Sequence, residues 1–225
     1  MTKIKLCGLS RPCDIEWANA LQPDFIGFVF AQKSKRYVAP EAAKALRKAL
    51  GAGIRAVGVF VNEAPESVAA LLNGGVIDIA QLHGGEDERY IQKLREYSDR
   101  PLIQAFRIST SADLDRAKAS SADWVLLDNG AGGTGAAFDW TLIRKFDRPY
   151  FLAGGLSPEN AGDAVRMLHP WAVDVSSGIE TEGRKDVKNE KIPYNTILLF
   201  DNITCMCGYE KRYDKMHRFL EGLSI

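Results

Sequence analysis

Apolar runs in this 225-residue sequence end in groups that can do chemistry. One run ends in Cys7 and another ends in Asp128, while glycine-rich or serine-rich turns follow at residues 132–135, 154–155 and 176–178. A thiolate can act as a base or a nucleophile, and a carboxyl group in apolar surroundings can act as a general acid or base. Backbone N–H groups in such turns can hold phosphate. The combination predicts proton-transfer chemistry on a small phosphorylated ligand.

Cys7 and Asp128 each have a structural alternative. A free cysteine is commonly a small buried hydrophobe, and Asp128 followed by Asn129 is typical of a turn. Ionisation of Cys7 near neutral pH needs nearby positive charge, and Lys5 lies on the same face of the expected strand. Gly8 would let a ligand approach the thiol closely. Cys13 lies in the first helical pattern and is interpreted as structural.

The binding candidates lie after other strand-like segments. Arg36 belongs to a charged stretch, and such stretches are usually exposed to solvent. Its guanidinium is also suited to bind a substrate carboxylate. His83 ends the fourth strand-like segment, and it has no histidine or cysteine companion at metal-ligand spacing, so no metal site is expected. The expected phosphate-binding and loop positions are glycines and a serine, namely Gly133, Gly154, Gly155, Ser177 and Gly178.

Short β-rich runs alternate with amphipathic stretches, which predicts βα units and a parallel sheet. The expected strands lie near residues 3–7, 24–30, 54–61, 77–82, 101–106, 123–128, 150–153 and 172–175. The expected helices lie near 11–20, 40–50, 65–73, 86–97, 113–118, 139–146 and 158–167, the last beginning with Ser157 as cap and Pro158 at its first position. Eight strands can close without an unpaired edge, so a TIM barrel, an α/β fold, is favoured over an open doubly wound sheet. In such a barrel all the chemical groups would meet at one end.

Composition limits the class of protein. Lys and Arg total 29 and Asp and Glu total 29, so no net charge steers the chain toward nucleic acid or an anionic membrane surface. No apolar run approaches the ~20 residues needed to span a bilayer. Four cysteines in a chain of this length do not form a secreted disulfide framework, and no leader-like segment opens the sequence. We expect a cytoplasmic protein with reduced thiols.

The sequence changes character after Asp186. Residues 188–213 contain a polar stretch, Pro193 and a short strand-like run, whereas residues 214–223 have apolar residues at helical spacing. We therefore expect one barrel domain over residues 1–225, with an insertion at 188–213 between the last strand and its helix. An insertion there can be an inert loop, an oligomer contact, or an element that displaces the closing helix.

Seven stretches, in order, resemble the phosphoribosylanthranilate isomerase family of tryptophan biosynthesis. They begin with Lys5-Leu6-Cys7-Gly8-Leu9 and end with Asp174-Val175-Ser176-Ser177-Gly178-Ile179-Glu180, and the resemblance covers residues 3–186. Between them come the segment from Gly27 to Val38, Gln81-Leu82-His83-Gly84, Leu127-Asp128, Gly132-Gly133-Thr134-Gly135, and Leu152-Ala153-Gly154-Gly155-Leu156. The segment at 188–213 departs from the family pattern, which passes almost directly into the last helix.

The resemblance implies a (βα)8 barrel, no cofactor, and the Amadori rearrangement of a phosphosugar substrate. Asp128 would be the general acid that opens the ribose ring, and Cys7 the general base that removes the proton from C2. Arg36 would bind the anthranilate carboxylate, with Asp128 starting protonated and Cys7 starting ionised.

The resemblance also assigns binding roles to the turns. The backbone around Gly154, Gly155, Ser177 and Gly178 would hold the phosphate, and the 132–135 loop would close over the ligand. The protein would be a monomer or a homodimer. The alternatives are a different phosphosugar isomerase or epimerase, with two aspartates or a metal, and a phosphosugar-binding protein without activity.

Overall fold

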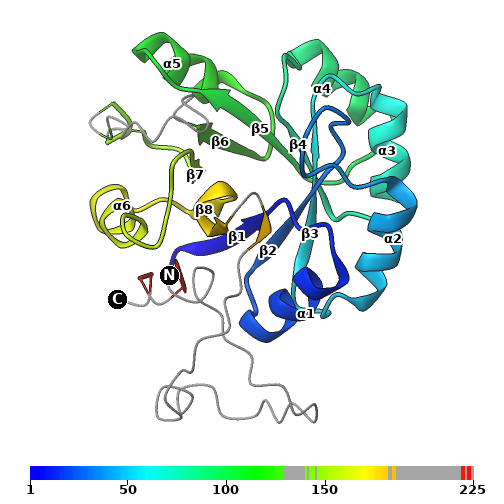
Figure 1. Cartoon of the computed structure of the whole chain (residues 1–225). Helices are drawn as coiled ribbons and strands as arrows, with labels where there is room; N and C mark the ends of the chain where they lie inside the picture. Colours follow the sequence, from blue (N-terminus) through cyan, green and yellow to red (C-terminus); the bar gives the residue numbers. More distant parts are fainter. Residues whose placement is uncertain are drawn as a thin grey trace, which may run out of the picture.

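The computed structural model places eight parallel strands in a closed barrel with helices on its outside (Figure 1). It describes residues 1–128, 140, 142–144, 146–181, 184–185, 219–220 and 222–223. The barrel strands are β1 (Lys3–Cys7), β2 (Phe25–Val29), β3 (Arg55–Phe60), β4 (Ile79–Leu82), β5 (Leu102–Arg107), β6 (Trp124–Asp128), β7 (Tyr150–Ala153) and β8 (Ala172–Val175). The helices are α1 (Pro12–Leu21), α2 (Pro40–Ala49), α3 (Pro65–Asn73), α4 (Glu88–Arg95), α5 (Ser111–Ala119) and α6 (Ala161–Leu168). All eight expected strands are confirmed.

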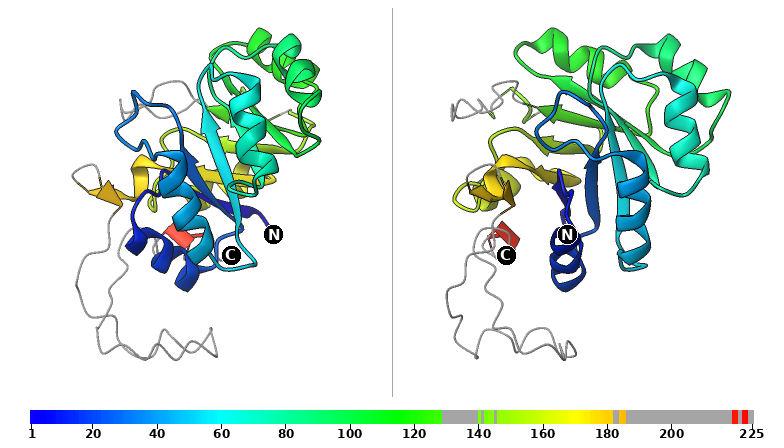
Figure 2. Two further views of the ribbon diagram at one scale, coloured as in Figure 1. Left: turned by 90° about the vertical axis from the view of Figure 1, so that its right-hand side faces the viewer. Right: turned by 45° about the vertical axis from the view of Figure 1, so that its right-hand side comes forward.

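Closure of the barrel depends on pairing between the first and last strands. β1 pairs with β2 on one side and with β8 on the other, with Lys5 opposite Asp174 in the second pair. This pairing excludes the open doubly wound sheet, which would leave two free edges. The turned views show the helices surrounding the strands (Figure 2). Polar groups at the strand ends therefore share one rim, which we call the mouth of the barrel.

Successive side chains along each strand point to opposite faces of the sheet, and they form two apolar layers. One face of each strand packs against the helices, as Leu6 of β1 and Leu127 of β6 do. The other face fills the barrel, where Phe25, Leu126 and Phe151 belong to an inner cluster. Cys7 belongs to a third cluster with residues of β2 and β3. Because side chains alternate, Lys5 and Cys7 of β1 and Asp128 of β6 all face inward.

Local signals explain where the helices begin. Pro12, Pro40 and Pro65 occupy the first turns of α1, α2 and α3, where a missing N–H costs no helical hydrogen bond. Asp87 caps α4 by accepting a hydrogen bond from the backbone N–H of Tyr90 at 3.0 Å. No helix in the described parts of the chain is long and apolar enough to cross a membrane.

Two expected helices differ from the prediction. The helix expected from residue 158 begins at Ala161, because residues 158–160 form a turn in which Asn160 Oδ1 accepts a hydrogen bond from the N–H of Ser157. In the helix expected at 139–146, residues 140 and 142–144 form turns rather than a helix, and residues 139, 141 and 145 lie outside the described residues. The expected closing helix at 214–223 is described only at 219–220 and 222–223, where Phe219 is fully buried in the outer core.

Candidate active site

Cys7 is the last residue of β1 and carries a free thiol at the mouth of the barrel. Its side chain packs with Val29 and Val59 and is 8% exposed. Gly27 lies opposite it on β2, and a Cβ atom there would come within 2.6 Å of the Cys7 sulfur. The glycine on the neighbouring strand therefore provides the space that the sulfur occupies.

A buried ion pair lies beside Cys7 on the inward faces of β1 and β8. Lys5 is fully buried, and its Nζ donates a hydrogen bond to Asp174 Oδ2 at 2.7 Å. Burial by itself lowers the pKa of Lys5, but the charges and hydrogen bonds of Asp174 and Cys7 raise it above its ordinary value. Lys5 is thus an ammonium ion within the barrel.

The thiol of Cys7 is protonated in the ligand-free barrel. Burial raises its pKa, the negative charge of Asp174 raises it further, and the positive charges of Lys5 and Lys185 only partly oppose this. The expectation that Cys7 starts ionised therefore does not hold for the ligand-free protein, because desolvation of the thiolate outweighs the nearby cations.

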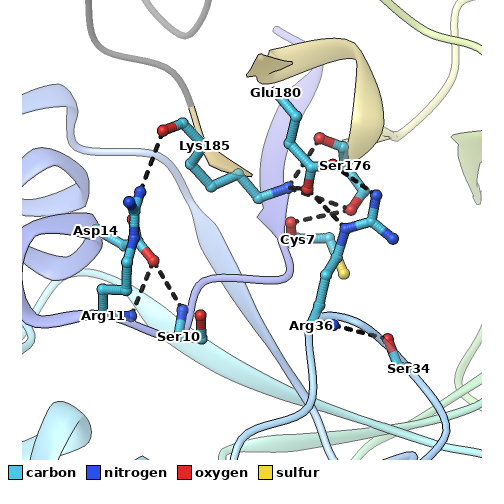
Figure 3. A network of polar contacts seen from close by, with 9 residues as sticks. All are labelled: Cys7, Ser10, Arg11, Asp14, Ser34, Arg36, Ser176, Glu180 and Lys185. Carbon is cyan, nitrogen blue, oxygen red and sulfur yellow. Dashed lines mark hydrogen bonds and ion pairs between the residues drawn. The ribbon is translucent and has the colours of Figure 1, made fainter. Parts of the chain in front are cut away.

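Arg36 is held across the mouth by Glu180, which follows β8 (Figure 3). Arg36 donates from Nε to Oε1 at 2.6 Å and from Nη2 to Oε2 at 2.7 Å. These hydrogen bonds raise the pKa of Arg36. Burial alone would raise the pKa of Glu180, but hydrogen bonds from Arg36 and Lys185 lower it, so both groups are charged. Such paired hydrogen bonds fix the plane of the guanidinium.

Lys185 completes this network from a short hairpin after β8. The hairpin pairs β9 (Glu180–Thr181) with β10 (Arg184–Lys185), with Lys185 opposite Glu180. Lys185 Nζ donates to Glu180 Oε1 at 2.6 Å and to the carbonyl of Ser176 at 2.8 Å, while the Ser176 hydroxyl donates to the Cys7 carbonyl at 3.2 Å. The network therefore connects Arg36 to the end of β1.

This arrangement changes the expected role of Arg36. The edge of the guanidinium formed by Nε and Nη2 already binds Glu180, so it is not open for a paired contact with a substrate carboxylate. The remaining Nη1 points away from Glu180 (Figure 3). A substrate carboxylate would therefore have to bind at Nη1, on a guanidinium whose plane Glu180 already fixes.

Asp128 ends β6 on the other side of the mouth, where it lies near His83. His83 Nε2 is 3.6 Å from Asp128 Oδ2, and the other ring nitrogen, Nδ1, is 2.8 Å from Gln81 Nε2. The contact with Gln81 fixes the orientation of the imidazole ring, and Nε2 faces Asp128. His83 was expected to bind substrate, and the structure places it beside the candidate acid.

The two expected phosphate turns touch each other through their backbones. Gly154 and Gly155 follow β7 with φ of 86° and 67°, which only glycine adopts readily. Gly178 lies in a 3₁₀ turn (Ser177–Ile179) after β8, and a Cβ atom there would be 1.8 Å from the carbonyl oxygen of Leu156. The absence of a side chain at Gly178 is what allows the two turns to meet.

Some expected site elements lie outside the described residues, among them Gly133, the rest of the 132–135 loop, and the 188–213 segment.

The structure also reveals charged groups that sequence reasoning missed, namely Asp174, Glu180 and Lys185. Asp174 and Glu180 are charged residues beside buried strand ends, which is a detectable signal. The partnership between Glu180 and Lys185 depends on hairpin pairing that no sequence pattern showed.

The closed barrel, the thiol and carboxylate at strand ends and the adjoining glycine turns define a (βα)8-barrel enzyme of the phosphosugar isomerase type. A family model described as N-(5'phosphoribosyl)anthranilate (PRA) isomerase matches residues 4–192. The chain belongs to this family.

Relatives and solved structures agree with this assignment. The N-(5'-phosphoribosyl)anthranilate isomerase of Endomicrobium trichonymphae is 44% identical over 191 residues, covering 83% of this chain and 94% of the relative. The structure of the Thermotoga maritima isomerase, a protein also described as dimeric, is 31% identical with a TM-score of 0.79, covering 99% of this chain and 98% of that one. An isomerase in complex with reduced 1-(o-carboxyphenylamino)-1-deoxyribulose 5-phosphate is 37% identical with a TM-score of 0.73, covering 83% and 93%.

Proposed function

We propose that the mouth of this barrel isomerises N-(5-phospho-β-D-ribosyl)anthranilate to 1-(2-carboxyphenylamino)-1-deoxy-D-ribulose 5-phosphate by general acid–base catalysis. Family membership supports isomerase activity in tryptophan biosynthesis. The observation that carries the mechanism is the placement of Cys7 and Asp128 at the inward-facing ends of β1 and β6, with β7 and β8 between them. A sugar held in the mouth would have one group on each side.

The first step opens the ribose ring. Asp128 donates its proton to the ring oxygen as the bond between that oxygen and C1 breaks, and the anthranilate nitrogen forms an iminium with C1. His83 Nε2 lies 3.6 Å from Asp128 Oδ2, and with a hydrogen on Nε2 it would stabilise the carboxylate that this step leaves behind.

The second step moves the proton from C2. The thiolate of Cys7 removes it, the electron pair of the broken bond forms the C1–C2 double bond of an enolamine, and the iminium is neutralised. The enolamine then tautomerises to the ketone. The positive iminium favours the thiolate, which offsets the burial that keeps Cys7 protonated without ligand.

Binding uses the groups around this pair. We assign the anthranilate carboxylate to Arg36 and the phosphate to the backbone around Gly154, Gly155, Ser177 and Gly178. The neighbouring turns support the second assignment, because two adjacent backbone segments can direct N–H groups at one phosphate. We also assign Gly133 to a loop that closes over the ligand. We place the activity in the cytoplasm, where Cys7 stays reduced, and propose that the chain works as a monomer or homodimer.

The test is steady-state consumption of phosphoribosylanthranilate by the native chain, Cys7→Ser and Cys13→Ser. We expect turnover by the native chain and a loss of about 10²–10⁴-fold in kcat for Cys7→Ser with little change in KM. Cys13→Ser should retain native turnover, because Cys13 lies on α1 outside the barrel interior. Near-native turnover by Cys7→Ser would refute the role of the base, and ligand binding without turnover by the native chain would favour a non-catalytic binding protein.

A further inference from the structure

The ion pair of Lys5 and Asp174 has no part in the mechanism above, although it lies next to the proposed base. Lys5 precedes Cys7 by two residues on the same inward face of β1, and Asp174 is its register partner on β8. Both side chains are more than nine-tenths buried. Neutral side chains of similar volume often stabilise a protein core as well as a buried ion pair does. The position of the pair therefore calls for an explanation other than stability.

The contacts of the pair leave part of the ammonium for the sulfur. An ammonium has three N–H donors, and the hydrogen bond to Asp174 Oδ2 at 2.7 Å uses one of them. Cys7 follows two residues later on the same inward face of β1, and the charge of Lys5 lowers the pKa of its thiol. Asp174 Oδ1 has no hydrogen-bond partner among the described residues. Lys5 is thus shared between a carboxylate and the thiol.

We propose that Lys5 is a positioning residue that stabilises the thiolate of Cys7, and that Asp174 holds Lys5 in place while offsetting part of its charge. This inference rests on the proposed role of Cys7 as the base.

The surrounding charges favour this role. Lys5 and Asp174 face Cys7 from β1 and β8, Arg36 from the loop after β2, and Glu180 and Lys185 from the hairpin after β8. Gly27, opposite Cys7 on β2, adds no titratable group. Three cations and two carboxylates leave one positive charge in excess while Cys7 is a thiol. Loss of the thiol proton leaves no net charge in the cluster. Burial lowers the pKa of Lys185, whereas the pKa of Lys5 is raised, so Lys5 is the lysine that keeps its charge beside the thiolate.

The test measures the ionisation of Cys7 without substrate, from the ultraviolet absorbance of its thiolate as the pH is raised. Each protein is compared with the same protein carrying Cys7→Ser, so that only Cys7 contributes. We expect Asp174→Asn to lower the pKa of Cys7 and Lys5→Met to raise it, each by about one to three units, as for a charge within a few ångströms. Opposite shifts at two partners are not expected from general damage to the core.

A second comparison covers the case in which Lys5→Met fails to fold because it leaves Asp174 buried and unpaired. The double variant Lys5→Met with Asp174→Asn contains no unpaired carboxylate, and it is compared with Asp174→Asn alone. We expect a higher pKa of Cys7 in the double variant, and Lys5→Arg, which keeps the charge, should stay nearer the native value than Lys5→Met. An unchanged pKa of Cys7 on removal of Lys5 would overturn the proposal.

The titration separates this inference from the proposed function. If Cys7→Ser keeps native turnover while Lys5 still shifts the titration of Cys7, the base is wrongly assigned and the influence of Lys5 on the thiol stands. If Cys7→Ser loses turnover while removal of Lys5 leaves the titration unchanged, the base stands and the role of Lys5 is refuted.

Discussion

Cys7 combines two properties that oppose each other, since it must ionise to act as a base and yet it is almost fully buried. Burial raises its pKa, while the charges of Lys5 and Lys185 act in the other direction. A base with a high pKa is also a strong one, so once ionised it removes a proton effectively. We therefore expect proton transfer when the iminium of the ligand adds its positive charge to those of Lys5 and Lys185, because together they offset the burial of the thiolate.

The pH dependence of turnover tests whether Cys7 must ionise, provided that the titration of Asp128 is removed by Asp128→Asn. In Asp128→Asn the residual turnover should rise as the pH increases through neutrality, because the fraction of Cys7 that is thiolate rises toward its elevated pKa. The measurement is kcat against pH for Asp128→Asn, with Asp128→Asn plus Cys7→Ser as the control. The control should lose the rise. A flat profile in Asp128→Asn would show that Cys7 does not limit proton transfer.

At the residue scale the sequence predicted where reactive side chains lie but not how they are paired. The positions of Cys7 and Asp128 at strand ends were predictable because each is a reactive residue at the end of an apolar run. The hydrogen bonding of Arg36 to Glu180 could not be predicted, because closure of the barrel brings these two residues together. The protonation of Cys7 was also missed, since burial outweighs a nearby lysine only when both are placed in three dimensions.

Among the structural elements, the hairpin after β8 does more than connect the barrel to the following chain. It places Glu180 between two cations, and Glu180 fixes the plane of Arg36. An arginine that is already oriented loses less conformational entropy on binding a carboxylate. If Arg36 binds the carboxylate as proposed, the hairpin supports the binding site without touching substrate.

We expect Glu180→Gln to raise KM by about tenfold or more, since a hydrogen bond to a charged group contributes about 1.5–3 kcal/mol. The proton-transfer groups are untouched, so kcat should change less than KM. Steady-state kinetics would measure both constants, with Glu41→Gln, an exposed residue in the first turn of α2, as the matched control. An unchanged KM would show that Arg36 does not depend on Glu180 for its orientation.

The contact between the β7 and β8 turns leads to a second prediction for an element. Gly178→Ala should separate the turns, because its Cβ cannot occupy a point 1.8 Å from the Leu156 carbonyl. We expect weaker binding of inorganic phosphate and a higher KM, measured by competition and steady-state kinetics. Gly53→Ala is the control, because its Cβ would have only one neighbour, at 4.0 Å. Equal phosphate binding by the two variants would argue against this phosphate site.

The positions of elements were more predictable than their ends. Every strand matched its expected place because buried parallel strands are short continuous apolar runs bounded by turns. The start of α6 was placed three residues early, since Ser157 and Pro158 carry the signature of a helix start and here form a turn stabilised by Asn160. A cap signal cannot distinguish a helix from a turn that precedes one.

At the scale of the whole molecule, closure turns separate strand ends into one site. β1 contributes the thiol, β6 the carboxyl group, and the segments after β7 and β8 the adjoining turns. The number of strands made closure predictable from the sequence. The register of β1 against β8, which places Lys5 opposite Asp174, could not be predicted, because no local pattern specifies contacts between residues this far apart.

The 188–213 segment remains an inferred insertion, and we propose that it is an inert loop. Deletion of residues 188–213 should leave turnover within a few-fold of native, because lengthening a loop costs little entropy and the proposed catalytic residues lie elsewhere. Turnover and thermal unfolding of the deleted chain are the measurements. Loss of folding or turnover would show that the segment supports the closing helix or the site.

The most direct test of the account is the kinetic isotope effect for substrate carrying deuterium at C2, measured on Cys7→Ser and Asp128→Asn. If Cys7 is the base, its loss makes removal of the C2 proton rate-limiting, and Cys7→Ser should show a primary isotope effect. If Asp128 is the acid, its loss slows ring opening. At high pH, where Cys7 is largely thiolate and the turnover of Asp128→Asn no longer rises, ring opening should be rate-limiting and the isotope effect should fall close to unity. The reverse pattern, or no effect in Cys7→Ser, would contradict the assignment of base and acid.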